Sequence, residues 1–149
     1  MVLAAALAGN VRMPADAATT GLVVTDPLSG LALSGFDPVA YFIDRTPQIG
    51  EGIHELIYRG AIWRFRNEGN RGAFARDPDV YAPRFGGYDP VVLARGVAIP
   101  GHPLIWLISD NRLYLFSRLD NRSSFAANIE RSIATAERGW REVEPTLVP

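Results

Sequence analysis

The chain has 149 residues, of which 48% are hydrophobic and 21% are charged, and its formal net charge is −1. This length suits one domain with a core of its own, and the composition excludes an intrinsically disordered chain. The near-zero charge gives no reason to expect nucleic acid or an anionic membrane as a partner. Cysteine is absent, which excludes disulfides, thiol nucleophiles, iron–sulfur clusters and the usual structural zinc sites. All basic residues are arginines, spread along the whole chain, which is more typical of codon bias than of an anion site.

The N-terminus predicts the remnant of an export signal. Residues 1–8 are small and apolar, and Ala15 to Ala17 have the A-x-A form of a signal-peptidase site. The apolar run is too short to span a bilayer, and the usual positive n-region is missing. We therefore expect a truncated signal-peptide remnant at 1–18 and a single mature domain at 19–149, without a membrane span. That domain would lie in the periplasm or outside the cell. A plain alanine-rich terminus is the alternative.

The first half of the domain predicts short helices around one hairpin. Asp37 and the proline after it favour a helical turn, because Asp caps a helix and Pro suits its first position. Residues 53–58 and 61–66 are two β-rich runs joined by an Arg-Gly turn. Two helical pieces should follow within 67–82, the first capped by Asn70 and the second begun by Asp77.

The second half predicts a helix, a second hairpin and a long terminal helix. A short helix is expected at 91–95, and the apolar run 104–108 predicts a strand covered on both faces. Residues 113–116 should return as its partner after a tight turn. Apolar residues at helical spacing form one continuous stripe, which predicts a single helix over 124–143. The members of this stripe are Phe125, Ile129, Ile133, Ala136 and Trp140.

No internal repeat is evident from the sequence. The predicted class is α+β, with a small antiparallel sheet from two β-hairpins packed against short helices and one long C-terminal helix.

The stretch around the chain's only Gly-Gly pair is the first candidate site. Gly86 and Gly87 could let a ligand approach the backbone closely, and Tyr88 and Asp89 follow directly. Asp37 and Tyr41 could join them in a polar pocket that binds a ligand. The alternative is a glycine turn beside a capped helix, with Asp89 as the cap.

Two histidines are the only imidazoles available to a metal. His54 lies near Glu51 and Glu55 and could hold a divalent ion with them, but adjacent strand residues point to opposite faces. His102 lies between a glycine and a proline, where a turn histidine is the alternative. Neither is more than a weak metal candidate, and no catalytic triad, phosphate loop or H-E-x-x-H motif is present.

Five blocks stand in order along the chain: GFDPVAYF at 35–42, YRGAIWRF at 58–65, NRGAF at 70–74, DPDVYAP at 77–83 and GGY at 86–88. Taken together they resemble the YHS-domain family, and more narrowly its exported single-domain members. The resemblance implies that some relatives handle metals through cysteines, and that the exported branch carries Cys or selenocysteine directly after Gly-Gly-Tyr. Here that position is Asp89, and Ala40 stands where the metal-handling relatives have a Cys. Sulfur-based metal binding or redox chemistry is therefore not carried over.

Three functions follow from these observations. The first is an exported YHS-like binding domain for a small ligand, a metal ion or a partner protein, with ligand and cofactor unknown. The second is a degenerate or structural interaction module without ligand chemistry. The third is an enzyme that uses Asp89 as acid/base in place of the thiol, which would need a pocket and a perturbed pKa. The sequence favours the first and leans away from an enzyme.

Overall fold

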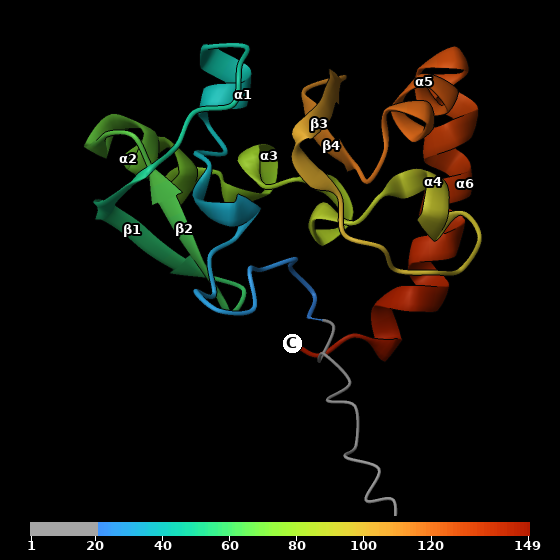
Figure 1. The fold of residues 1–149 in the computed structure, drawn as a ribbon, viewed down its shortest axis with the longest axis horizontal. Coiled ribbons are helices and arrows are strands. Elements are labelled where there is room, and N and C mark those ends of the chain that lie inside the picture. Colours follow the sequence, from blue (N-terminus) through green and yellow to red (C-terminus); the bar gives the residue numbers. More distant parts are fainter. Residues whose placement is uncertain (1–20) are drawn as a thin grey trace, which may run out of the picture.

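The computed structural model describes residues 21–149, so the expected signal remnant lies outside the described residues. The chain forms two lobes side by side, which we call the first lobe (31–82) and the second lobe (83–147) (Figure 1). The first lobe holds α1 (Ala40–Ile43), β1 (Glu51–Tyr58), β2 (Ala61–Phe65), α2 (Glu68–Arg76) and α3 (Pro78–Tyr81). The second holds α4 (Pro90–Leu93), β3 (His102–Ser109), β4 (Arg112–Phe116), α5 (Leu119–Ala127) and α6 (Ile129–Val143).

The α+β class is confirmed, and each hairpin forms a two-stranded antiparallel sheet of its own. Short 3-10 turns, η1 (Leu33–Gly35) and η2 (Arg84–Gly87), open the two lobes, and η3 (Glu144–Thr146) follows α6. Among the described residues, no helix combines the length and apolarity needed to cross a bilayer.

The two lobes repeat one order of elements, which the predicted organisation of the chain did not include. Each lobe runs from a 3-10 turn through a short helix and an antiparallel hairpin to two further helices. Both hairpins carry the same irregularity, a register shift between Glu51 and Glu55 in β1 and between His102 and Trp106 in β3. The expectation that the domain contains no internal repeat is therefore wrong.

The hairpin turns and one glycine per lobe repeat as well. Both residues of each turn have positive φ, Arg59 and Gly60 in one lobe and Asp110 and Asn111 in the other. A side chain at Gly50 or Gly101 would lie 2.5 Å from an atom of the facing strand, so only glycine fits.

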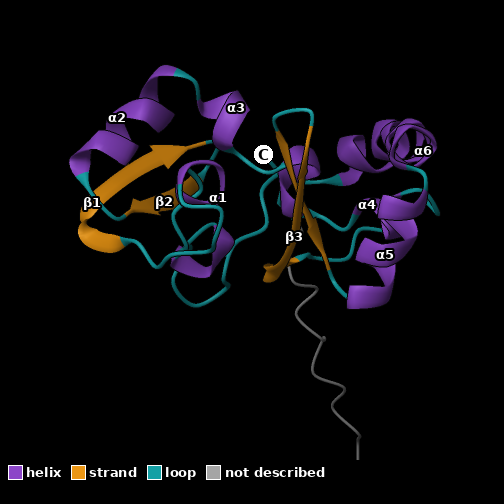
Figure 2. Cartoon of the chain, turned by 90° about the horizontal axis from the view of Figure 1, so that it is seen from above, coloured by secondary structure: helices purple, strands orange, loops and turns teal. Residues whose placement is uncertain are grey.

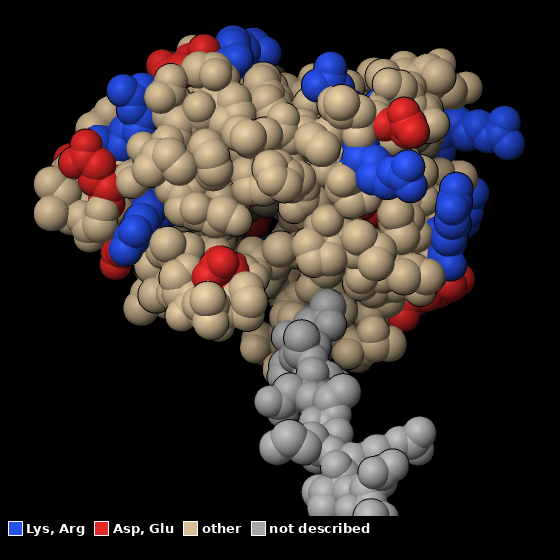
Figure 3. Space-filling model, in the orientation of Figure 1, with Lys and Arg blue, Asp and Glu red and all other residues tan. Residues whose placement is uncertain are grey.

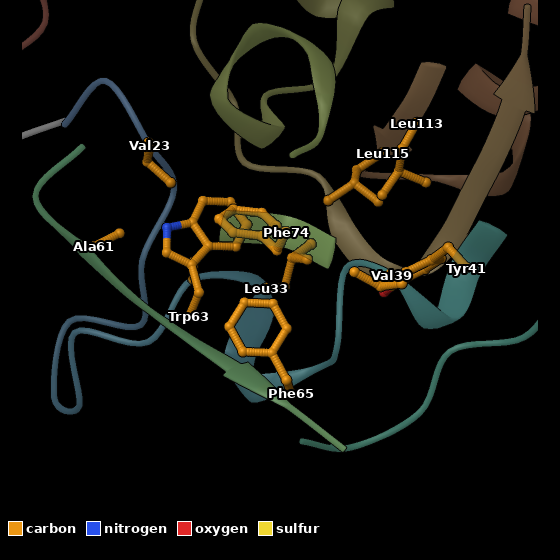
Figure 4. Close-up of a cluster of buried hydrophobic side chains, with 11 residues drawn as sticks. Val23, Leu33, Val39, Tyr41, Ala61, Trp63, Phe65, Phe74, Leu113 and Leu115 are labelled. Atoms are coloured by element: carbon orange, nitrogen blue, oxygen red, sulfur yellow. The ribbon is translucent and has the colours of Figure 1, made fainter. Parts of the chain in front are cut away.

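Strand β4 joins the two hydrophobic cores. Its side chains alternate, as in any strand, so Leu113 and Leu115 enter the first core while Tyr114 and Phe116 enter the second. Figure 4 shows the two leucines approaching the first core from across the lobe boundary, and Figure 2 shows their hairpin standing between the lobes. β4 is thus buried on both faces. The prediction that 104–108 is covered on both faces is confirmed for 105–108, because Trp106 and Ile108 pack against the first core and Ile105 and Leu107 against the second, but it is wrong for Leu104, which is 55% exposed.

The C-terminal helical region is two helices. The single helix expected over 124–143 breaks at Asn128, whose backbone is non-helical and whose Oδ1 accepts a hydrogen bond from the Arg131 N–H at 3.2 Å. Asn caps helices well because its short side chain reaches these N–H groups. The apolar stripe itself is confirmed, since all its members pack in the second core: Phe125, Ile129, Ile133, Ala136 and Trp140.

Two helical glycines give opposite predictions for the same substitution. A Cβ at Gly139 would lie 1.8 Å from the Leu93 carbonyl oxygen, where α6 packs against α4. We expect Gly139→Ala to lower the free energy of unfolding by about 1–3 kcal/mol or more through overpacking. At Gly72 in α2 the nearest atom to an added Cβ is the flexible end of Arg76 at 3.6 Å, so an alanine fits. Because Ala favours a helix over Gly, Gly72→Ala should raise the free energy of unfolding by about 0.5–1 kcal/mol. Urea titration of both variants measures the two signs, and a stable Gly139→Ala variant would contradict the packing of α4 on α6.

Candidate functional site

Asp37 is fully buried and ties together three elements of the first lobe. Its Oδ1 accepts a hydrogen bond from the Val39 N–H at 2.8 Å, at the entry to α1. Its Oδ2 accepts from the Arg66 N–H at 2.9 Å, after β2, and from Asn70 Nδ2 at 2.7 Å, in α2. The carboxylate therefore links the first helical turn, the end of the hairpin and the next helix.

Asp89 makes the equivalent set of contacts in the second lobe and is also fully buried. Its Oδ1 accepts from the Val91 N–H at 2.9 Å. Its Oδ2 accepts from the N–H and the hydroxyl of Ser117 at 2.7 and 2.6 Å, and from Asn121 Nδ2 at 2.7 Å. The expectation that Asp89 caps a helix is confirmed, and the cap is one part of a larger network.

The two carboxylates share no hydrogen-bond partner, and every partner they have belongs to the scaffold. Each replaces the water it would bind with several neutral donors, which is how a buried carboxylate is stabilised. Asn70 is one of these donors, so its predicted role as a helix cap is wrong. Asn67 caps α2 instead, accepting from the Asn70 N–H at 2.8 Å.

The two candidate tyrosines point to different places. The Tyr41 hydroxyl donates to the Pro103 carbonyl at 2.8 Å and so joins the first lobe to the start of β3. The Tyr88 hydroxyl donates to the Gly21 carbonyl at 2.6 Å. Burial raises the pKa of both phenols, and the Asp37 carboxylate adds to the rise at Tyr41. Their hydroxyls thus fasten separate segments and do not meet.

Gly86 and Gly87 are needed by the chain's own backbone. A Cβ at Gly86 would lie 1.9 Å from the Leu22 carbonyl oxygen, and the Gly86 carbonyl accepts a hydrogen bond from the Val24 N–H at 2.8 Å. Both glycines have positive φ, 63° and 91°, which side chains disfavour. The close approach expected of a ligand is therefore made by segment 21–24, which passes between the lobes.

These glycines also line a cavity of about 410 Å³ at the boundary between the lobes, which we call the interlobe cavity. Its volume falls in the usual range for small-molecule sites. Much of its lining is apolar, including Val23, Leu33, Trp63 and Leu115. Figure 3 shows the charged side chains mainly along the margins of one face, with a recess near its middle. Asp37, Tyr41, Tyr88 and Asp89 do not line this cavity.

Asp26 and His102 supply polar groups to the interlobe cavity. Asp26 Oδ1 accepts from the N–H groups of Leu28 and Ser29 and from the Ser29 hydroxyl, and these bonds lower the pKa of the carboxyl. No described residue donates to Oδ2 of Asp26, so this solvent-accessible oxygen can accept from water or from a ligand in the cavity. His102 Nδ1 accepts from the Leu104 N–H at 3.1 Å, so the neutral ring carries its proton on Nε2 and can donate.

The weak metal candidates do not assemble a metal site in the part of the chain that the structure describes. No group of three or more His, Asp or Glu side chains is placed to hold an ion there. His54 Nδ1 lies 3.6 Å from Glu68 Oε2, while Glu55 pairs with Arg64 at 2.7 Å. His102 lines the interlobe cavity, and its Nδ1 is already occupied by the Leu104 N–H.

The residues missed from the sequence are the partners of the two aspartates and the polar group at Asp26. A signal for the former was present, since Gly35 to Val39 and Gly87 to Val91 share the pattern G-x-D-P-V. Both lobes also contain N-R-x-x-F, beginning at Asn70 and Asn121. Aligning the two motifs would have paired the aspartates with the asparagines that bind them. Nothing in the sequence marks Asp26 apart from its Asp-Pro turn.

Comparison with family models, with curated proteins and with solved structures returned no match to this chain. The resemblance to the YHS family therefore stays an expectation from the sequence.

The buried networks predict matched losses of stability. Asp37→Asn and Asp89→Asn should each lower the free energy of unfolding by about 2–4 kcal/mol, because the new amide NH2 faces a donor and leaves buried groups unsatisfied. Asp120→Asn is the control, since its side chain is 88% exposed and should change stability by less than about 0.5 kcal/mol. Urea titration measures all three. A loss for one aspartate alone would contradict the equivalence of the lobes.

The buried tyrosines predict an alkaline loss of stability. The chain has neither Lys nor Cys, so tyrosines dominate its titration above about pH 9. A phenol whose pKa is higher in the folded state stabilises the fold fully below its unfolded pKa, and this contribution is lost as pH rises toward the folded value. The free energy of unfolding should therefore fall above about pH 10, less steeply in Tyr41→Phe. Urea titrations between pH 8 and 11 give the free energy of unfolding against pH for both proteins. Equal slopes would exclude Tyr41 as a cause of the alkaline loss of stability.

Proposed function

We propose that this chain is a non-catalytic binding protein, an exported domain of the YHS type, that takes up a small apolar molecule in the interlobe cavity. The molecule carries a hydroxyl or amine group that donates to Asp26. The observation that carries the proposal is a largely apolar cavity of about 410 Å³ with a solvent-accessible carboxylate in its lining, Asp26, whose Oδ2 accepts from no described residue. A few placed polar groups in an apolar cavity are typical of small-ligand sites.

The chemistry of the lining supports a ligand of this class. Trp63, Leu33 and Leu115 offer apolar contact, which favours burial of a hydrocarbon or aromatic body at about 25 cal/mol per Å². Asp26 accepts and His102 Nε2 donates, so an alcohol could bond to both and an amine to Asp26. Export is supported by the signal-like N-terminus, and the YHS type by the motif blocks between 35 and 88.

The burial of both aspartates favours a binding protein over an enzyme that works through Asp89. A general acid or base must come within hydrogen-bond reach of the substrate. Asp89 is fully buried, and its oxygens bond to Val91, Ser117 and Asn121. A second candidate function, a structural interaction module without a ligand, is supported by this same saturation of the carboxylates.

Binding can be tested with N-phenyl-naphthylamine, an apolar arylamine whose fluorescence rises in a dry site. We expect saturable binding with a Kd of about tens to hundreds of micromolar, the value for a ligand of this size. Asp26→Asn keeps an oxygen for the turn but removes the charge, and we expect it to weaken binding by about tenfold. The measurement is a fluorescence titration at neutral pH.

Asp120→Asn is the matched control, because this exposed side chain lies outside the cavity lining and its loss should leave the Kd unchanged. Leu115→Trp fills the cavity from β4 and should abolish binding in protein that remains folded by circular dichroism. Absence of saturable binding by the unaltered chain, or an equal Kd in Asp26→Asn, would favour the structural module.

A further inference from the structure

A second cavity, of about 760 Å³, contains three arginines that neither the buried aspartates nor the interlobe cavity uses. Arg59 comes from the β1–β2 turn, Arg84 from η2 and Arg112 from the start of β4. They are far apart in the sequence, so the fold alone gathers them in what we call the arginine cleft. Its lining also includes the rings of Tyr58, Trp63, Phe85 and Trp140.

Arg59 occupies a backbone position that suits other residues better. Its φ is 49°, in the left-handed region that Asn, Asp and Gly adopt most readily. The equivalent turn residue of the second lobe is Asp110, also at φ 49°, which follows that preference. Leu33, Arg45 and Phe85 adopt the same region, so what distinguishes Arg59 is that its side chain lines the cleft.

Two of the guanidinium groups are held by aromatic rings. Arg59 lies over the ring of Tyr58 and Arg84 over the ring of Phe85, each with its Cζ 5.2 Å from the ring centre. A guanidinium stacked in this way keeps its N–H donors at its edge, available to an oxyanion. The Nε–H of Arg84 is buried and has no hydrogen-bond partner among the described residues. A buried donor without a partner is unfavourable, so a bound acceptor would remove a cost that the empty cleft carries.

The lining of the cleft also contains two carboxylates, Asp79 and Glu144, and among the described residues Glu144 makes no ion pair with any of the three arginines. Arg59 pairs with Asp79 at 3.0 Å, and Arg84 pairs with Glu137 at 3.3 Å. Within residues 21–149, Arg112 has no ion pair, and its Nη1 makes only a long hydrogen bond of 3.5 Å, to the Asp79 backbone carbonyl. Arg112 is therefore the cation whose charge and donors remain open to a ligand.

We infer that the arginine cleft binds an organic anion that joins a carboxylate or phosphate group to an aromatic ring. The oxyanion bonds to Arg112 and Arg84, whose planar forks match its oxygens. The ring packs against Trp140, which is partly buried at the edge of the second core. The arginine cleft differs from the interlobe cavity because it selects an anion. Its binding of an anion does not depend on whether the interlobe cavity binds a ligand.

Isothermal titration calorimetry of the full chain tests the inference with phenyl phosphate, benzoate and benzyl alcohol. We expect the two anions to bind with submillimolar Kd and the uncharged alcohol not to bind. The stronger of the two anions identifies whether phosphate or carboxylate is preferred. Higher salt should weaken binding, because screening reduces attraction between charges that water can reach.

Arg112→Gln should weaken anion binding by at least about tenfold while the protein stays folded, because this side chain has no ion pair to lose. Arg84→Gln should weaken anion binding to a similar degree. This variant also breaks the ion pair with Glu137, and urea titration measures the resulting change in stability separately from the change in Kd. Arg122→Gln is the matched control, an exposed arginine on α5 outside the cleft. Equal Kd values in Arg112→Gln and Arg122→Gln, equal binding of benzyl alcohol, or no binding of either anion at millimolar concentration would overturn the inference.

Discussion

One buried carboxylate in each lobe holds that lobe's elements together. Asp37 and Asp89 each accept from the first turn of a helix, from the end of a hairpin and from an asparagine of the next helix. Because short helices and two-stranded hairpins have little stability alone, they depend on such tertiary contacts. A charged acceptor bonded to several buried donors fixes their relative positions, since any displacement would leave polar groups unsatisfied.

The repeated lobes differ where they meet, and the candidate sites lie there. Strand β4 gives alternate side chains to the two cores, whereas β2 serves the first core with Ala61, Trp63 and Phe65. The second lobe also ends in the 15-residue α6, where the first lobe has only the four residues of α3. Segment 21–24 enters between the lobes, with Val23 in the first core and Val24 against the second. This unequal packing leaves two cavities at the boundary, one mainly apolar and one rich in arginine.

The residues that the sequence indicates as a candidate site have structural roles. The side chains that are open to a ligand belong to no sequence motif. Asp89 resembles a reactive position because it begins a helix after a Gly-Gly pair, yet the helix uses it as an acceptor. Gly86 resembles a ligand approach point, yet Leu22 occupies the space beside it. Arg112 and Asp26 have no motif around them, and only their missing partners distinguish them.

The sequence by itself determined the class of the fold and most of its local structure. Both hairpins follow from their β-rich runs and turn residues, and the helix start at Asp89 follows from an Asp-Pro cap, because these signals act over a few residues. α3 also begins at the predicted Pro78, although the Asp77 side chain makes no cap hydrogen bond. The break at Asn128 was missed because the apolar stripe continues across it, and the stripe reports burial rather than backbone continuity. Only the tertiary structure decided that the two faces of β4 enter two separate cores. It also decided which arginines share a cleft, because contacts between residues far apart in the chain depend on how the lobes pack, which no local pattern encodes.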